Sequence, residues 1–217
     1  IFWKALVLTV VVFLLGVSLG YFLEKNRLED FKSEFGKIET DWADARLLGR
    51  YFSEITPEVC DNAINQNLIF ADKIYREGLK LDKYDSAAPL TEKQVEFEIK
   101  RYALFKVEFL LNSIDLRKRC NATYVNLIYF FNANPKPEEE ARQDVQSRVL
   151  RKIKDIYGPD LMLIPLPLDL DISFINILKN NHNIQKVPTL LINEKIKLDG
   201  VYPQQDLIQE IENARKA

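Results

Sequence analysis

Hydrophobic residues follow three different patterns along this chain. An uncharged run covers residues 5–23 (ALVLTVVVFLLGVSLGYFL) and is long enough to cross a hydrocarbon core of about 30 Å. From there to residue 120, apolar residues recur three and four positions apart, as they do in amphipathic helices. Beyond residue 120 the runs become short, β-branched and aromatic, which favours strands alternating with helices. The pattern therefore predicts an apolar anchor, a helical region and a C-terminal α/β domain.

The apolar run predicts a transmembrane anchor at residues 1–23. A cleavable signal peptide would have a shorter apolar region, and no Ala-x-Ala-like cleavage site precedes Glu24. Lys4 indicates a cytoplasmic N-terminus, so we expect a single-pass protein whose C-terminal domain lies outside the cytoplasm. Gly16 and Gly20 are spaced so that two spans could approach closely, but glycine is also common in spans generally, and both interpretations stay open.

A helical stalk is predicted for residues 24–55. Its apolar positions step by three and four residues, which is the spacing of a heptad seam. Gly36 interrupts this seam, and fewer than four heptads are sustained. The pattern is equally compatible with a coiled-coil homodimer and with a helix that packs on later helices of the same chain. The seam consists of Leu28, Phe31, Phe35, Ile38, Trp42 and Ala45.

An antiparallel helical hairpin is predicted for residues 56–120. Thr56 is followed by proline, which is an N-cap signal, and the first helix is expected to reach about Leu81. The polar stretch DKYDSAAP then breaks the helix. A capping box at residues 91–94 (TEKQ) opens the second helix, which is expected to reach about Arg119.

The two cysteines of the chain lie at corresponding ends of this hairpin. Cys60 opens the first helix and Cys120 ends the second, so an antiparallel arrangement brings them together and favours a disulfide over two unrelated buried thiols. The chain-entropy model gives such a cross-link roughly 4 kcal/mol. A structural disulfide indicates an oxidising compartment. The adjoining Asn121-Ala122-Thr123 is an N-glycosylation sequon, which modestly favours the same location.

The last region, residues 121–217, predicts the order βαβαββα. Each strand run is rich in β-branched or aromatic residues, and the helical segments are amphipathic. The expected strands cover residues 124–131, 161–168, 189–193 and 195–198, and the expected helices cover residues 137–157, 172–179 and 204–214.

Three stretches of this domain carry a resemblance. They are KVPTLLIN, the tight hairpin INEKIKLDG, and Gly200 followed by VYPQQDLIQEI. With the element order, they resemble the thioredoxin-like superfamily in minimal form, without its N-terminal strand and helix. Pro165 and Pro167 agree with this interpretation, because prolines two residues apart suit an edge strand, and the missing strand would make the second strand an edge.

The chain departs from redox-active thioredoxins where their Cys-x-x-Cys motif would lie. The stretch Asn134-Pro135-Lys136-Pro137 occupies that place, and none of these residues can exchange a disulfide. The resemblance implies a cis-proline at Pro188, with Val187 and Thr189 beside it in a groove that pairs with an extended peptide. The alternative is that Pro188 only determines a turn inherited with the fold, and both readings stay open.

Other chemistry has little support in the sequence. The net charge of −2 gives no basic surface for nucleic acid. His182 lies alone in a polar stretch, and Asp169 with Asp171 offers too few oxygen donors for a metal. We therefore expect no metal and no other cofactor.

Two classes of function remain. The first is a membrane-anchored, extracytoplasmic thioredoxin-fold protein that binds or helps to assemble polypeptides without catalysis. The second is a thiol-disulfide oxidoreductase whose redox couple is Cys60 and Cys120. The sequence favours the first, because Cys120 precedes the first strand and so lies at the opposite end of the domain from the expected site.

Overall fold

The computed structural model describes residues 2–51, 57–85 and 92–216. The chain forms two compact units, residues 1–47 and 48–217. The predicted N-caps at residues 56 and 91, and the predicted tip of the hairpin, lie outside the described residues.

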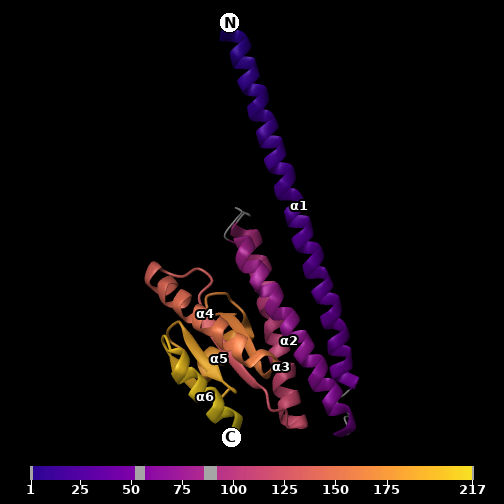
Figure 1. Ribbon diagram of the computed structural model, residues 1–217, viewed down its shortest axis with the longest axis vertical. Coiled ribbons are helices and arrows are strands. Elements are labelled where there is room, and N and C mark those ends of the chain that lie inside the picture. The colour runs from indigo at the N-terminus through magenta and orange to yellow at the C-terminus, as the bar shows by residue number, and fades with distance from the viewer. Residues whose placement is uncertain (1, 52–56, 86–91, 217) are drawn as a thin grey trace. The chain divides into compact units, whose positions relative to one another are not determined.

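The first unit consists of most of α1, a single helix over Phe2–Tyr51, drawn in indigo in Figure 1. The helix runs through the predicted anchor and the predicted stalk, and through Gly36. Its segment Phe2–Leu23 has a mean hydropathy of 2.5 and none of it is buried, so one helix is long and apolar enough to span a membrane. A signal sequence would meet the same criterion. The side chains of the predicted heptad seam lie outside those described, so the coiled coil stays a prediction.

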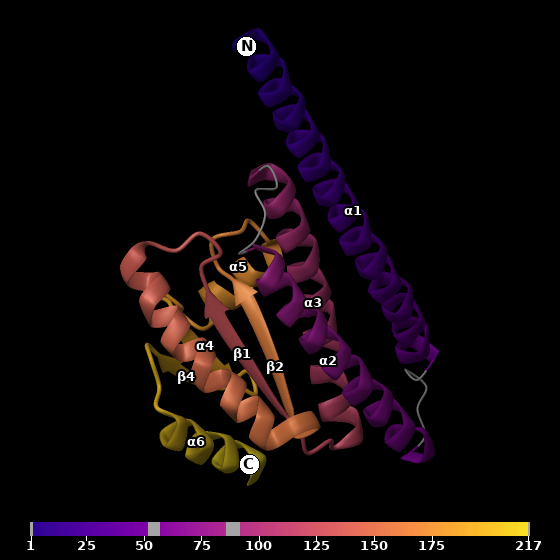
Figure 2. The same ribbon diagram turned by 45° about the horizontal axis from the view of Figure 1, so that its top comes forward.

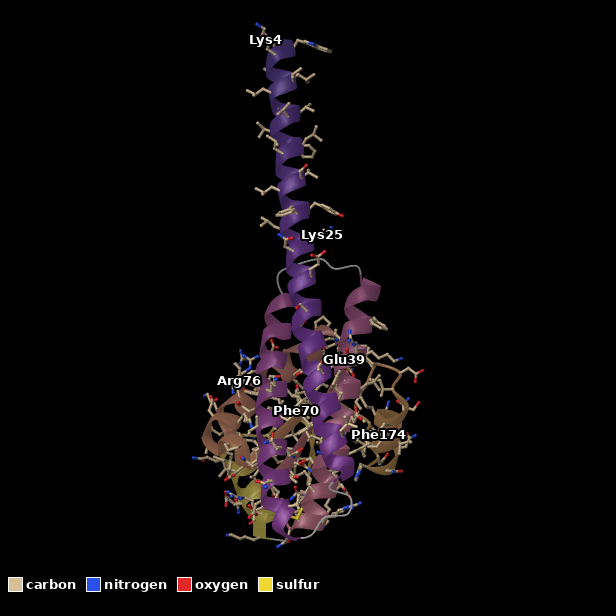
Figure 3. The ribbon with its side chains drawn as sticks, turned by 90° about the vertical axis from the view of Figure 1, so that its right-hand side faces the viewer. Lys4, Lys25, Glu39, Phe70, Arg76 and Phe174 are labelled. Atoms are coloured by element: carbon tan, nitrogen blue, oxygen red, sulfur yellow. A yellow bond between two sulfur atoms is a disulfide. The ribbon has the colours of Figure 1, made fainter. Side chains whose placement is uncertain are left out.

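Charged residues flank the apolar segment of α1. Figure 3 labels Lys4 near its start and Lys25 just beyond its end. Lys25 forms an exposed ion pair with Glu29, one turn later, at 4.0 Å. Charge therefore begins where the hydrocarbon core of a membrane would end.

The second unit begins with the hairpin, in which α2 (Pro57–Asp85) and α3 (Glu92–Cys120) pack together. The rings of Phe70 and Phe109 lie 5.9 Å apart between their centroids. The Tyr102 hydroxyl donates to the carbonyl of Ile74 at 2.6 Å, which satisfies a buried phenol. Aromatic packing and one buried hydrogen bond thus join the two helices.

The predicted disulfide between Cys60 and Cys120 is present. The sulfur atoms are 2.07 Å apart and the two Cα atoms 5.4 Å apart. It lies where α2 begins and α3 ends, which is the lower end of the hairpin in Figure 3.

A four-stranded sheet follows the hairpin, with the order β2-β1-β3-β4. The central strand β1 (Val125–Phe131) pairs in parallel with β2 (Leu161–Pro167) and antiparallel with β3 (Thr189–Ile192). The hairpin partner of β3 is β4 (Ile196–Asp199). This arrangement, with its connecting helices, confirms the predicted α/β order.

One face of the sheet packs on α4 (Pro137–Tyr157) and α6 (Gln204–Lys216), through a continuous apolar core. In Figure 2, α4 crosses in front of β1. The strand positions in this core alternate along each strand, as the period of two requires. The core comprises Val125, Leu127, Tyr129, Leu150, Ile153, Leu161, Leu190, Ile192, Leu198, Leu207, Ile211 and Ala214.

The opposite face of the sheet is covered by α5 (Ser173–Asn181), which lies behind the parallel strands in Figure 2, and by α3. Ile128 and Phe130 point to this side and are fully buried. Of the helices that follow β1, only α5 lies on this side, so the hairpin supplies the rest of the layer that buries these side chains. This explains why apolar residues surround much of α3.

The edge position of β2 is confirmed. The amide of Leu168 donates to the carbonyl of Phe131 on β1 at 2.7 Å. Because backbone direction alternates along a strand, the nitrogens of Pro165 and Pro167 face the open edge, where no donor is needed.

Candidate functional site

Three loops meet at the end of the sheet where β1 finishes. The pairing of Phe130 with Thr189 brings the start of β3 beside the end of β1. The hydrogen bond from Leu168 to Phe131 brings the segment after β2 to the same place. The loop of residues 132–136 leaves β1 at this end and leads into α4. The predicted site residues in the loop before β3 and in the loop of residues 132–136 are therefore neighbours.

The loop before β3 contains a cis peptide bond between Val187 and Pro188. Both residues and Thr189 are buried. The Pro188 carbonyl accepts from the amide of Gly200 at 2.8 Å. Gly200 has a φ of 91°, which a residue with a Cβ would adopt only with strain. A glycine therefore lets the chain after β4 close against the cis-proline loop.

The Thr189 hydroxyl fixes the same loop from the other side. It donates to the carbonyl of Lys186 at 2.8 Å and lies 3.0 Å from Oδ1 of Asp199 on β4. Asp199 is also paired with Lys197 at 3.4 Å. The threonine thus joins the loop to the neighbouring strand, so that the backbone of Val187 is held in place.

The backbone of Val187 itself takes no part in these contacts. Within the described parts of the chain, neither its amide nor its carbonyl has a hydrogen-bond partner. Regular pairing of β3 begins two residues later, at Thr189. Val187 therefore has one donor and one acceptor that a further extended strand could use.

The loop of residues 132–136 is held by the carboxylate of Asp169. Its Oδ1 accepts from the amide of Ala133 at 2.7 Å, and its Oδ2 accepts from the amide of Asn134 at 2.7 Å. Hydrogen bonds to an ionised acceptor are stronger than neutral ones. Asp169 therefore holds the first half of this loop in place.

Gln143 of α4 holds the preceding residue in the same way. Its Oε1 accepts from the amide of Asn132 at 2.7 Å, and its Nε2 donates to the carbonyl of Asn132 at 3.1 Å. Glu139 accepts from the Asn132 side chain and from the amide of Lys136, and these hydrogen bonds lower the pKa of its carboxyl. The loop is fixed at both ends by side chains of α4.

The structure separates the two carboxylates that the sequence presented as a pair. Asp169 binds the loop after β1, whereas Asp171 accepts from the Asn176 side chain of α5 at 3.1 Å. Among the described residues, no group of three or more His, Cys, Asp or Glu side chains could hold a metal ion. His182 caps the C-terminus of α5 with its amide and is half-buried.

The disulfide lies at the other end of β1. Cys120 precedes β1 by a few residues, whereas the cis-proline loop pairs with its last residues. A rise of about 3.3 Å per residue over the strand separates the two ends by about 20 Å. The disulfide and the three loops are therefore distinct sites.

A buried polar network surrounds the disulfide end of the sheet. The Ser113 hydroxyl donates to Oδ1 of Asn126 at 2.7 Å, and Nδ2 of Asn126 donates to Glu194 at 3.1 Å. Glu194 forms an ion pair with Arg117 of α3. The Tyr124 hydroxyl donates to the Ser113 carbonyl at 2.6 Å, and burial raises its pKa to about 12. The hairpin is thus bound to the sheet by polar contacts as well as apolar packing.

A buried lysine lies where the hairpin meets the 3-10 turn before β2. Lys154 Nζ donates to the carbonyls of Gly158 at 2.6 Å and Leu161 at 2.7 Å. It also lies 5.7 Å from the centre of the Tyr75 ring of α2. Burial lowers its pKa. The lysine thus provides hydrogen-bond donors at the C-terminus of α4, where backbone carbonyls lack helical partners.

Strand order, parallel and antiparallel pairing and a cis-proline at the head of β3 together decide the fold. The C-terminal domain is thioredoxin-like. It carries no Cys-x-x-Cys motif. No family model and no curated protein matches the chain.

Solved thioredoxin structures resemble this thioredoxin-like domain. One is thioredoxin-2, a component of malaria parasite protein secretion machinery, at 23% identity over 42% of this chain and 82% of its own, with a TM-score of 0.34. Chloroplastic thioredoxin z has 14% identity over 46% and 87%, with a TM-score of 0.36. Thioredoxin O2 from Arabidopsis thaliana, in its oxidised state, has 21% identity over 50% and 87%, with a TM-score of 0.34.

Proposed function

We propose that this protein is anchored in a membrane with its thioredoxin-like domain outside the cytoplasm, and that it binds extended polypeptides without exchanging disulfides. The observation that carries the proposal is the backbone of Val187. Its amide and carbonyl have no partner among the described residues, while the adjoining Pro188 and Thr189 are fixed by hydrogen bonds.

Such a backbone suits the addition of one extended strand. A peptide would donate to the Val187 carbonyl and accept from its amide, and these bonds do not depend on the peptide's sequence. The residues around Val187 are already ordered by Gly200 and Asp199. Less conformational entropy is then lost on binding than with a mobile loop.

Catalysis of disulfide exchange has no support at this place. Asn134 and Pro135 have no thiol, and Asp169 already occupies the amides of Ala133 and Asn134. A helix N-terminus lowers the pKa of a nearby thiol by offering such amides to the thiolate. The three loops therefore keep the peptide-binding part of a thioredoxin-like site without its redox part.

In the proposed function the two cysteines form a structural cross-link and take no part in binding. Cys60 and Cys120 join the base of the hairpin about 20 Å from the three loops. Disulfides of this kind persist in oxidising compartments. Together with the apolar segment Phe2–Leu23, the disulfide supports an anchor with the second unit on the extracytoplasmic side.

The test uses the full chain in detergent and a panel of fluorescent, cysteine-free peptides of random sequence. We expect several peptides to bind in an anisotropy titration. Methylating the backbone nitrogen of the pairing residue should abolish binding, because the peptide's donor is lost. Cysteine-free peptides exclude mixed disulfides as the cause.

Two variants of Val187 provide the matched comparison. Val187→Pro removes the amide donor and should weaken binding at least tenfold, whereas Val187→Ala keeps the backbone groups and should bind nearly as well. Peptides that bind equally to both variants and are insensitive to N-methylation would show that the site is elsewhere. If no peptide of the panel binds, the proposal is wrong.

A further inference from the structure

One motif of the sequence has no part in the proposed peptide site. Asn121-Ala122-Thr123 connects the end of α3 to β1, and it is the single Asn-x-Ser/Thr sequon of the 217-residue chain. The side chains of Asn121 and Thr123 are both exposed. Asn121 has a φ of 50°, which asparagine adopts more readily than most residues. The acceptor therefore lies in a short irregular segment at the surface.

The Asn121 carboxamide is also available for modification. Within the described residues it takes part in no hydrogen bond. Nearby asparagines differ, because Asn126 is fully buried and bonded to Ser113, and Asn193 donates to the carbonyl of Ala214. Glycosylation at Asn121 would break no contact that holds the fold.

We infer that Asn121 is an N-glycosylation site, an inference that rests on the extracytoplasmic location proposed above. The Nδ2 atom would attack C1 of the first sugar of a polyprenyl-diphosphate-linked oligosaccharide, as an oligosaccharyltransferase substrate. The C1–N bond forms and the C1–O bond to the phosphate breaks. The lipid diphosphate leaves with the bonding electron pair, and the amide releases one proton to a base.

The position of Asn121 keeps a glycan away from the peptide. Asn121 precedes the first residue of β1, whereas Val187 lies near the last residue of that strand. About 20 Å of strand separates these ends. The glycan would instead extend beside the Cys60–Cys120 disulfide, which requires the same oxidising compartment. One end of the sheet thus carries the covalent modifications and the other remains open.

The test is synthesis of the full chain in the presence of glycosylating microsomes. We expect the wild-type chain to gain mass equal to one core oligosaccharide, and an endoglycosidase to remove it. Thr123→Ala should abolish the gain, whereas Thr123→Ser, which keeps the sequon, should retain it. Thr123 is exposed, so neither variant disturbs the core. A wild-type chain that stays unmodified would overturn the inference.

A second acceptor separates an inaccessible site from a wrong orientation. Gln185→Thr, made together with Thr123→Ala, turns Asn183 into a sequon, and Asn183 is also exposed with a φ of 48°. Modification of this variant but not of wild type overturns the inference for Asn121 alone. If neither chain is modified, the second unit does not reach the glycosylating side of the membrane, and the inference is wrong for that reason. The peptide titration in detergent does not depend on orientation, so the binding proposal is tested separately.

Discussion

Ser113 of the hairpin and Asn126 of the central strand are joined by a hydrogen bond of 2.7 Å between two fully buried side chains. Each polar group would be costly to bury alone, and together they satisfy one another. The pair therefore fixes the position of α3 on the sheet. It requires that the hairpin and the thioredoxin-like domain fold against each other.

Replacing Ser113 should destabilise this junction. We expect Ser113→Val to lower the free energy of unfolding by about 1 to 3 kcal/mol, because the Asn126 acceptor loses its partner in a buried site. Urea titration of the full chain in detergent measures the change. Ser173→Ala, at an exposed serine, should shift the midpoint little. Equal effects of the two variants would contradict the importance of the pair.

Asp169 should control the exchange of two amides. In Asp169→Ala, the Ala133 and Asn134 amides lose their acceptors and should exchange hydrogen at least tenfold faster. Asp171→Ala is the matched control, because Asp171 contacts only Asn176 in the described contacts. Hydrogen-exchange mass spectrometry of the peptide that contains residues 132–137 gives the readout. Unchanged exchange in Asp169→Ala would show that the carboxylate does not hold the loop.

Reduction of the disulfide should destabilise the hairpin without creating a catalyst. The disulfide joins cysteines 60 positions apart. For a loop of this length the chain-entropy model predicts a stabilisation of roughly 4 kcal/mol. We expect reduction to lower the melting temperature by several degrees, and the Cys60→Ser, Cys120→Ser variant to behave like the reduced chain. A redox titration followed by mass should show reduction only at very negative potential.

The same titration tests the alternative function. Easy and reversible reduction with unchanged thermal stability would indicate a working redox couple. Turnover of a disulfide substrate by wild type, lost in the double serine variant, would establish the oxidoreductase. Peptide binding that persists in the serine variant would show that recognition does not need the thiols.

Two buried tyrosines should make the fold sensitive to alkali. Burial raises the pKa of Tyr124 and Tyr129 from 10.0 to about 12. The folded state then binds more protons between these values, so their stabilisation is complete below pH 10 and is lost as pH rises through 12. For a buried group, a pKa shift of two units corresponds to about 2 to 3 kcal/mol in the free energy of unfolding.

The measurement is the urea midpoint as a function of pH between 9 and 12. We expect the midpoint of wild type to fall over this range. Tyr124→Phe should reduce the slope, although the variant starts lower because it loses the hydrogen bond to the Ser113 carbonyl. A midpoint that stays constant between pH 9 and 12 would contradict the prediction.

Sequence patterns predicted those features of the fold that depend on neighbours along the chain. The order of the strands and helices followed from spacing, and the prolines of β2 identified an edge because a missing donor is a property of the residue itself. The disulfide followed from helix lengths. The predicted anchor and stalk both lie in α1, which continues past Leu23 because the polar residues that follow are good helix formers.

The contacts that hold the site could not be predicted in the same way. Asp169 lies 36 positions from Ala133, and Ser113 meets Asn126 only because α3 lies across the sheet. Lys154 is buried against two carbonyls, and no pattern in the sequence singled it out. Such contacts depend on tertiary arrangement, for which the spacing of residues carries little signal.

If the chain is anchored as proposed, the prolines of β2 have a further consequence. Anchored copies share a thin layer and collide edge to edge far more often than copies free in solution. At the open edge of β2, Pro165 and Pro167 have no hydrogen to donate, and the carbonyl of Leu161 is taken by Lys154. A strand from a neighbour would find fewer hydrogen-bond partners along this edge, which disfavours the pairing of two sheets through β2.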